Sequence, residues 1–308
     1  MSDRPARVRV TVPATSANLG PGFDTLGLAL GRYDVVTAEA GFGGDEEPVV
    51  VRVEGAGAGQ VPTDDTHLVV QAMRACFAEL GTKASSLRLD CHNDLPHGRG
   101  LGSSAAAIVS GVLAARELSG SGHTMDDAAA LALAGRIEGH PDNVAPCLLG
   151  GLTIAWTDDH GVARAVREDV HPDVTAIVCV PDTEVSTQKA RALLPASVSH
   201  ADAARNAGRA ALLVEALTRR PDLLLEATDD RLHQSYRAPA MPGTLALVAA
   251  LRAAGRAAVV SGAGPSVLVL SAGDDLEPVS ALAVGWSVQQ LPIEPRGAVV
   301  ERESGVGR

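Results

Sequence analysis

The sequence predicts an α+β protein built from two lobes. Helical and strand-like patterns are intermixed along the chain, without the regular alternation that a doubly wound parallel sheet requires. A length of 308 residues allows one large core or two moderate ones, because domains cluster near roughly 100 to 150 residues. Apolar residues at 46% and charged residues at 20% are close to the averages of globular proteins.

The first half of the chain carries most of the clear periodic patterns. Strand-like runs occur at residues 8–12, 35–40, 49–53 and 87–91. Helices are predicted at residues 66–80, 103–118 and about 125–137, the last of them ended by Gly139 and Pro141. Residues 13–24, rich in Gly, Pro, Asn and Ser, are expected to form a loop or turn.

The second half begins with strands at residues 152–156 and 174–180, separated by an acidic turn at 158–161. We expect the lobe boundary near this turn, which gives an N-terminal lobe at 1–160 and a C-terminal lobe at 161–308. The remaining segments are helices at 203–217, 221–228 and 244–254, followed by strands at 257–260 and 266–270 around a tight glycine turn.

Composition argues against several classes of partner. A formal net charge of -11 and 2% aromatic residues disfavour nucleic acid. No apolar stretch approaches the ~20 residues that span a bilayer, and residues 1–12 lead directly into Pro13 without an apolar signal segment, so we expect no membrane association and a cytoplasmic location.

The cysteines and lysines narrow the chemistry further. The four cysteines are scattered without a Cys-x-x-Cys pair, so we expect reduced core thiols rather than a zinc site or a disulfide framework. Lys83 and Lys189 are the only lysines, and neither follows a glycine, which excludes a Walker-type phosphate loop. Any bound triphosphate must therefore be held mainly by backbone amides or arginine.

Residues 94–106 join a strand to a helix through three glycines, a composition typical of a phosphate cradle. Glycine exposes backbone N–H groups, and the positive end of the following helix attracts anions. Ser103 and Ser104 can add a hydroxyl ligand for Mg²⁺. On this interpretation Gly102→Ala weakens nucleotide binding while stability stays roughly unchanged; if the loop is only a helix cap, stability alone falls.

A dinucleotide fingerprint is disfavoured because the preceding strand ends too early.

Three segments together resemble the GHMP kinases. Residues 96–106 resemble the Pro-x-x-x-Gly-Leu-Gly-Ser-Ser-Ala-Ala motif of that superfamily, residues 13–24 resemble its first motif, and residues 261–266 its third. The stretches 22–27, 138–146, 186–191 and 236–237 are similar to the homoserine kinase family in particular. The resemblance implies a ribosomal-protein-like N-terminal lobe with a left-handed βαβ unit, a ferredoxin-like C-terminal lobe, and a homodimer.

The resemblance also implies ATP and Mg²⁺ as cofactors and L-homoserine as the substrate. The residues implied to bind nucleotide are Pro96, His97, Gly98, Arg99, Gly100, Leu101, Gly102, Ser103, Ser104, Ala105, Ala106, Gly262 and Gly264. The residues implied to hold the metal are Ser103, Ser104 and Glu138. The residues implied to bind substrate are Asn18, Asp24, His140, Asn143, Thr187, Arg191 and Arg237, with His140, Asn143 and Arg191 also implied to be catalytic.

Each of these residues has an ordinary structural alternative. Asn18 and Asp24 are typical turn residues, Glu138 could be a solvated helix end, and residues 261–266 could be only a hairpin turn. Asn143 cannot act as a general base, and we expect the side chain of the adjacent Asp142 to diverge from it, which leaves a phosphate oxygen to take the proton. The alternative functions are a GHMP kinase for another small alcohol, or a catalytically silent paralogue that senses a metabolite.

Overall fold

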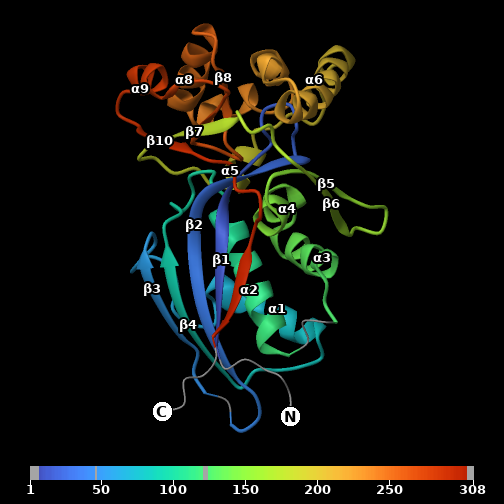
Figure 1. Cartoon of the computed structure of the whole chain (residues 1–308), viewed down its shortest axis with the longest axis vertical. Helices are drawn as coiled ribbons and strands as arrows, with labels where there is room; N and C mark the ends of the chain where they lie inside the picture. Colours follow the sequence, from blue (N-terminus) through green and yellow to red (C-terminus); the bar gives the residue numbers. More distant parts are fainter. Residues whose placement is uncertain (1–6, 46, 121–123, 304–308) are drawn as a thin grey trace.

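The computed structural model describes residues 7–45, 47–120 and 124–303, and it has two lobes stacked along the long axis of the molecule (Figure 1). Each lobe is a β-sheet covered by helices. Residues 1–6, which belong to the N-terminal stretch where we expect no signal segment, lie outside the described ranges.

The lower lobe contains a seven-stranded sheet in the order β11-β1-β2-β4-β3, with β5 paired to β2 and β6 paired to β5. Its strands are β1 (Arg7–Ala17), β2 (Leu26–Gly41), β3 (Val50–Gly55), β4 (Ser86–Asn93), β5 (Leu152–Thr157), β6 (Ala163–Glu168) and β11 (Val299–Glu303). All neighbours are antiparallel except β3 and β4, which are parallel and are connected through a helix.

Helices cover one side of this sheet and lie behind and to the right of its strands in Figure 1. They are α1 (Leu68–Glu79), α2 (Ser103–Leu118), α3 (Asp127–Glu138) and α4 (Pro141–Leu149). Small residues let α2 lie close to its neighbours: a Cβ at Gly111 would be 2.5 Å from the carbonyl oxygen of Val69 in α1. This close packing fixes the N-terminus of α2, where the predicted phosphate loop ends.

The upper lobe contains a four-stranded antiparallel sheet in the order β10-β7-β9-β8. Its strands are β7 (Thr175–Val180), β8 (Ala257–Val260), β9 (Val267–Ser271) and β10 (Ser287–Leu291). Its helices are α5 (Thr187–Arg191), α6 (His200–Thr218), η1 (Pro221–Leu223), α7 (Leu224–Ala227), η2 (Ser235–Ala240), α8 (Pro242–Ala253) and α9 (Leu276–Leu282). Figure 1 shows α6, α8 and α9 at the top of the molecule, away from the lower lobe.

The structure corrects the expected loop at residues 13–24. Strand β1 continues to Ala17, because after a register shift between Pro13 and Ala14 it pairs again with β2. A bulge at this point accommodates proline, which cannot donate to the ladder. Only the residues from Asn18 onward form the turn.

Pro141 also has a different role from the one expected. It follows the end of α3 but begins α4, because proline suits the first turn of a helix, where its missing N–H is not needed. The sequence patterns also did not identify β6, which pairs with β5, or β11, which pairs with β1. The expected division at residue 160 therefore falls inside a hairpin, and the chain passes from the first sheet to the second between Glu168 and Thr175.

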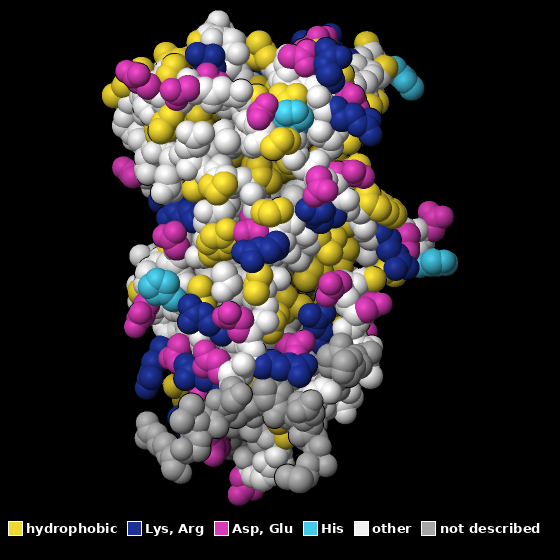
Figure 2. Space-filling model, viewed as in Figure 1, with side chains coloured by type: hydrophobic (Ala, Val, Ile, Leu, Met, Phe, Trp, Pro, Cys, Tyr) yellow, Lys and Arg dark blue, Asp and Glu magenta, His cyan; other side chains and the backbone are white. Residues whose placement is uncertain are grey.

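The interior and surface agree with the composition. All four cysteines are buried free thiols, and burial raises the pKa of Cys76, Cys91 and Cys179 to about 12. Among the described residues, no helix has both the length and the apolarity needed to cross a membrane. Basic and acidic side chains are interspersed over the strands of the lower lobe (Figure 2), where Arg7 pairs with Glu39 and Glu303.

Candidate active site

The three glycine-rich segments meet at the junction of the lobes. The Ser261 hydroxyl donates to the carbonyl oxygen of Gly100 at 2.6 Å and contacts the Ser16 hydroxyl at 2.9 Å. The N–H of Gly262 donates to the carbonyl oxygen of Ala17 at 3.1 Å. Residues more than 240 positions apart in the chain are thereby hydrogen-bonded to one another.

These segments enclose a cavity of about 240 Å³ between the lobes, close to where Figure 1 shows α5 above α4. Most of the sequence-predicted site residues line it. They are Asn18, Gly98, Gly100, Gly102, Ser103, Ser104, Glu138, His140, Asn143, Thr187, Arg191, Arg237, Gly262 and Gly264. The predicted residues that do not line it are Asp24, Pro96, His97, Arg99, Leu101, Ala105 and Ala106.

The loop glycines are required first by the protein itself. Gly98, Gly100 and Gly102 all have φ between 63° and 73°, in the left-handed region. A Cβ at Gly102 would lie 1.9 Å from Oγ1 of Thr15, and one at Gly100 would lie 2.3 Å from the carbonyl oxygen of Ser261. The expectation that Gly102→Ala would spare stability is therefore wrong, because strand β1 already occupies the space.

The other loop residues support the cradle from behind. Leu101, Ala105 and Ala106 are buried in the core of the lower lobe. Arg99 reaches across to the upper lobe, where it donates to the carbonyl oxygen of Asp182 at 2.7 Å and pairs with Glu184 at 3.1 Å. Its guanidinium thus links the two lobes instead of lining the cavity.

Ser104 and Glu138 lie side by side in the cavity wall. The Ser104 hydroxyl donates to Oε1 of Glu138 at 2.6 Å. Burial raises the pKa of Glu138, which means that its carboxylate lacks much of its hydration. A hydroxyl and a desolvated carboxylate are hard oxygen donors of the kind that Mg²⁺ prefers. The residues present therefore fit a magnesium ion shared with phosphate oxygens.

The N-terminus of α4 forms another part of the wall. His140 is the N-cap residue, and its Nδ1 lies 2.6 Å from Oδ1 of Asp142. This hydrogen bond is the main reason why the pKa of His140 is raised. Asp142 was expected to turn away from Asn143, but both line the cavity, and the Asp142 side chain is almost fully buried.

Asn143 is oriented by the first strand. Oγ1 of Thr15 donates to Oδ1 of Asn143 at 2.9 Å, a contact between residues 128 positions apart. The amide oxygen is therefore occupied, while the amide nitrogen has no partner within the described residues. Asn143 thus presents hydrogen-bond donors to the cavity. The sequence analysis did not name Thr15, because it interpreted residues 13–24 as a loop and selected only Asn18 and Asp24 from that segment.

Asp24 and Arg191 form a two-point ion pair. Nη1 of Arg191 lies 2.9 Å from Oδ2 of Asp24, and Nη2 lies 2.6 Å from Oδ1. The pairing raises the pKa of Arg191. The structure thus brings together the two residues expected to bind opposite ends of a zwitterion, although Asp24 itself does not line the cavity.

Arg237 carries a buried charge. It is 1% exposed, and its Nη1 donates to the carbonyl oxygen of Gly262 at 3.0 Å. No ion pair to a carboxylate is found for it within the described ranges, and burial lowers its pKa. Asn18 donates to the same carbonyl oxygen and accepts from the N–H of Asp24, so its amide joins the two turns. A buried guanidinium without a counter-ion attracts anions.

A second cavity of about 240 Å³, missed by the sequence analysis, lies on the other side of Ser103 and Ser104. Its walls are largely apolar and include Val36, Val61, Pro62, Leu68 and Val69. The polar side chains among them include Asp34, His67, Asn93 and His97. The Nδ1 atom of His67 is buried without a partner in the described part of the chain. Ser103 and Ser104 line both cavities, so the two lie next to each other.

Comparison with known proteins assigns the fold and the family. The sequence models of the GHMP kinases N terminal domain and the GHMP kinases C terminal domain match residues 67–151 and 203–286. The solved homoserine kinase from Cytophaga hutchinsonii has a TM-score of 0.84 at 27% identity, over 98% of this chain and 99% of that one. Mevalonate diphosphate decarboxylase from Staphylococcus aureus, at 13% identity and a TM-score of 0.69, shares the fold over 96% of this chain and 98% of its own.

Curated relatives are more similar in sequence. The homoserine kinase of Streptomyces coelicolor is 54% identical over 96% of this chain and 95% of its own length. That of Mycolicibacterium smegmatis is 50% identical over 92% and 91%. Together with a cavity that joins a glycine cradle, a serine–glutamate pair and two arginines, these similarities show that the chain belongs to the homoserine kinase family of the GHMP kinases.

Proposed function

We propose that this protein transfers the γ-phosphoryl group of ATP to the side-chain hydroxyl of L-homoserine and forms O-phospho-L-homoserine. The observation that carries the proposal is the composition of the inter-lobe cavity. Its lower wall has the donors that a triphosphate needs, and its upper wall has the charged groups that an amino acid needs. The two sets meet at Asn143, where the reacting atoms belong.

ATP spans the two cavities in this proposal. The base lies in the largely apolar cavity beside α1, and the phosphates cross Ser103 and Ser104 into the inter-lobe cavity. The glycine loop and the N-terminus of α2 supply backbone N–H groups and a positive dipole end. His67 and Asn93 are the polar groups available to the edge of the base.

Ser104 and Glu138, with Ser103 beside them, would hold Mg²⁺ together with phosphate oxygens. When bound, the ion neutralises charge that develops on the phosphates. Glu138 and Ser104 are already in contact, so this part of the site needs little rearrangement.

L-homoserine lies under the upper lobe. Its carboxylate is bound by Arg237, which has no carboxylate partner of its own among the described residues, and by Arg191. Its ammonium group binds Asp24, whose ion-pair partner among the described residues is Arg191. Thr187, at the start of α5, offers its hydroxyl to the polar end of the substrate. The substrate hydroxyl then points toward Asn143 and His140.

The reaction is an in-line displacement. The hydroxyl oxygen of homoserine attacks the γ-phosphorus, the bond from that phosphorus to the β,γ-bridging oxygen breaks, and ADP leaves with the electron pair. Asn143 orients the hydroxyl through its amide N–H groups, and the proton passes to a phosphate oxygen of the transferred group. His140 helps to position the hydroxyl, Arg191 adds positive charge, and the site acts by alignment and electrostatic stabilisation.

Further parts of the proposal concern the lobes and the setting of the enzyme. We propose that the parallel pair β3 and β4, with α1 between them, is the left-handed βαβ unit of a ribosomal-protein-like lobe, and that the antiparallel sheet of the upper lobe belongs to a ferredoxin-like fold. A homodimer in the cytoplasm, with no nucleic acid or membrane partner, follows from the family resemblance and from the composition.

Magnesium-dependent release of ADP tests the proposal when it is measured with homoserine, serine, threonine, mevalonate and galactose in parallel. We expect turnover with L-homoserine well above that with the other compounds. Equal or higher turnover of mevalonate or galactose would assign the protein to another GHMP activity. Tight binding of homoserine without turnover of any compound would instead indicate a metabolite sensor.

A further inference from the structure

His233 does not line the inter-lobe cavity, yet it touches the residues that shape its upper wall. The side chain is fully buried. Its ring stacks on Phe23 with the centroids 5.1 Å apart and the planes inclined by 26°. Its Nε2 lies 2.8 Å from the carbonyl oxygen of Gly20. One side chain therefore holds two points of the turn that carries Asp24.

Phe23 in turn supports both arginines. The guanidinium carbon of Arg191 and that of Arg237 each lie 5.7 Å from the centroid of its ring. A cation is attracted to an aromatic face, and a planar guanidinium can also stack on it. Two like charges that would otherwise repel each other are thus held against one ring, whose position His233 sets.

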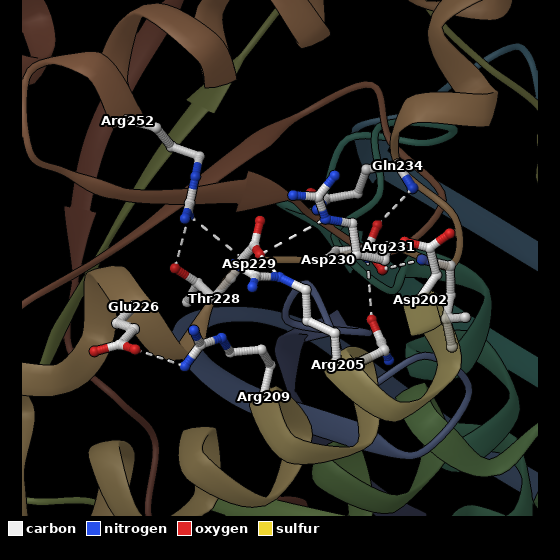
Figure 3. Close-up of polar contacts among 12 residues, drawn as sticks. Asp202, Arg205, Arg209, Glu226, Thr228, Asp229, Asp230, Arg231, Gln234 and Arg252 are labelled. Carbon is white, nitrogen blue, oxygen red and sulfur yellow. Dashed lines mark hydrogen bonds and ion pairs between the residues drawn. The ribbon is translucent and has the colours of Figure 1, made fainter. Parts of the chain in front are cut away.

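The segment that carries His233 is itself anchored. The Asp230 carboxylate accepts from the backbone N–H groups of Leu232, His233 and Gln234 at 2.8 to 3.2 Å. Oε1 of Gln234 accepts from the N–H of Val260, directly before the 261–264 glycine turn, at 2.6 Å. Figure 3 shows Asp230 and Gln234 within a wider polar network. Arg237 follows in the same segment, so its backbone has little freedom.

The chemistry of the His233 contact is specific. A carbonyl oxygen only accepts, so the proton of the neutral ring must sit on Nε2. Burial lowers the pKa of His233, which keeps the ring neutral beside the two arginines. A leucine would fill this core space, but it could neither donate to Gly20 nor stack on Phe23.

We propose that His233 is a positioning residue for the amino-acid end of the site: through Phe23 and Gly20 it sets the spacing of Arg191, Arg237 and Asp24. This inference rests on the proposed function, since the amino-acid end is defined by it. The prediction is a selective one. Loss of the His233 contacts raises the KM for homoserine and leaves the KM for ATP nearly unchanged, because the hydrogen bonds and ring contacts of His233 and Phe23 among the described residues do not involve the glycine loop or the second cavity.

Four variants separate the contacts. His233→Phe keeps a stacked ring and loses the donor, and His233→Gln keeps a donor near the Nε2 position and loses the ring. Phe23→Leu removes the aromatic face, and Phe23→Tyr restores it. Val279→Ala is the control, because it empties a fully buried site on α9 in the hydrophobic cluster around β8 and β9, which includes none of the residues of the turn. KM and kcat are measured for both substrates well below the melting temperature of each variant.

We expect Phe23→Leu to raise the KM for homoserine roughly two- to thirtyfold, the range of a cation–π contact. Phe23→Tyr should stay close to wild type. Either His233 variant should raise the KM for homoserine by up to about a hundredfold, since small misplacements of groups in a site can have an effect of that size. An unchanged KM for homoserine in folded Phe23→Leu and His233 variants overturns the proposal, and so does an equal rise for ATP. If His233→Phe fails to fold, Phe23→Leu against Phe23→Tyr decides. Wild-type protein that does not turn over homoserine counts against the proposed function instead.

Discussion

Asp24 and Arg191, 167 positions apart in the chain, are joined by two hydrogen bonds of 2.6 and 2.9 Å, so that each neutralises the other. A zwitterionic substrate can bind this pair without adding net charge to the site, because its ammonium group binds Asp24 while its carboxylate binds Arg191. Both side chains are about one third exposed, so the pair itself adds little stability.

Asp24→Asn should therefore act on binding more than on folding. We expect the KM for homoserine to rise roughly ten- to a hundredfold, because a charged hydrogen bond contributes about 1.5 to 3 kcal/mol and 1.4 kcal/mol is a factor of ten. The KM for ATP should stay within about a factor of two. Asp158→Asn is the matched control, since Asp158 pairs with Arg164 at 3.0 Å in the distant β5–β6 hairpin. Equal effects of the two variants on homoserine would contradict the assignment.

Arg237→Lys keeps the charge but loses the planar fork that reaches both the substrate carboxylate and the carbonyl oxygen of Gly262. Steady-state kinetics should show kcat/KM for homoserine lowered by roughly ten- to a hundredfold, with the KM for ATP barely changed. Arg256→Lys serves as the control, because Arg256 pairs with Asp275 away from the cavity. A raised KM for ATP with homoserine unaffected would place Arg237 at the nucleotide.

Asn143→Asp tests the proposed absence of a protein base. The new carboxylate can still accept from Thr15, but its second oxygen replaces the amide donors and puts negative charge close to the γ-phosphate. We expect kcat to fall more than the affinity for homoserine, as measured by turnover and by isothermal calorimetry. An increase in kcat would show that a base at this position assists the reaction.

Gly102→Ala should destabilise the protein as well as impair nucleotide binding. The left-handed φ of 73° and the 1.9 Å approach to Oγ1 of Thr15 both oppose a side chain. The matched control is Gly98→Ala, where φ is 63° but the nearest atom to the new Cβ is 3.6 Å away. Gly98→Ala should therefore cost about 1 kcal/mol, the penalty for the backbone conformation alone.

Thermal unfolding of the two variants distinguishes these costs. We expect the melting temperature to fall more for Gly102→Ala than for Gly98→Ala. Adding Thr15→Ser, which removes only a methyl group, should not restore the melting temperature of Gly102→Ala, because the hydroxyl remains. Equal drops for the two alanine variants would mean that β1 yields easily to the new Cβ.

Asp34 gives a pH-dependent prediction. Burial raises its pKa above the ordinary value, although the N–H groups of Asp94 and Leu95 donate to its Oδ1. A raised carboxyl pKa means that the folded state holds the proton more tightly than the unfolded state, so the contribution of Asp34 to stability is present below the unfolded pKa and is lost as pH rises through the folded pKa.

Asp34→Asn keeps an acceptor and removes this titration. The free energy of unfolding of the variant minus that of wild type should therefore be more positive at about pH 8 than at about pH 4, near the unfolded pKa of an aspartate. Denaturant melts at the two pH values measure this difference. If the free energy of unfolding of the variant minus that of wild type became less positive as pH rises, the direction of the pKa shift would be contradicted.

Much of the architecture is encoded locally. Helix α2 begins at Ser103 and ends at Leu118, as its composition predicts, because a glycine turn followed by a run of small residues leaves few alternatives. Strand β8 likewise spans Ala257–Val260 as predicted. The three glycine-rich segments could also be identified from the sequence, because their turns contain backbone conformations that favour glycine.

The chain by itself determined which residues are available to the site, and the tertiary structure decided what they do. The structure decided which turns touch, and it decided that Asp24 pairs with Arg191, that Thr15 orients Asn143 and that His233 supports Phe23. Each of these contacts joins residues more than 100 positions apart. The pairing of β11 with β1 and the second cavity have the same origin. No local pattern encodes such contacts, since they depend on the packing of whole elements, and it is this packing that converts turn residues into a binding site.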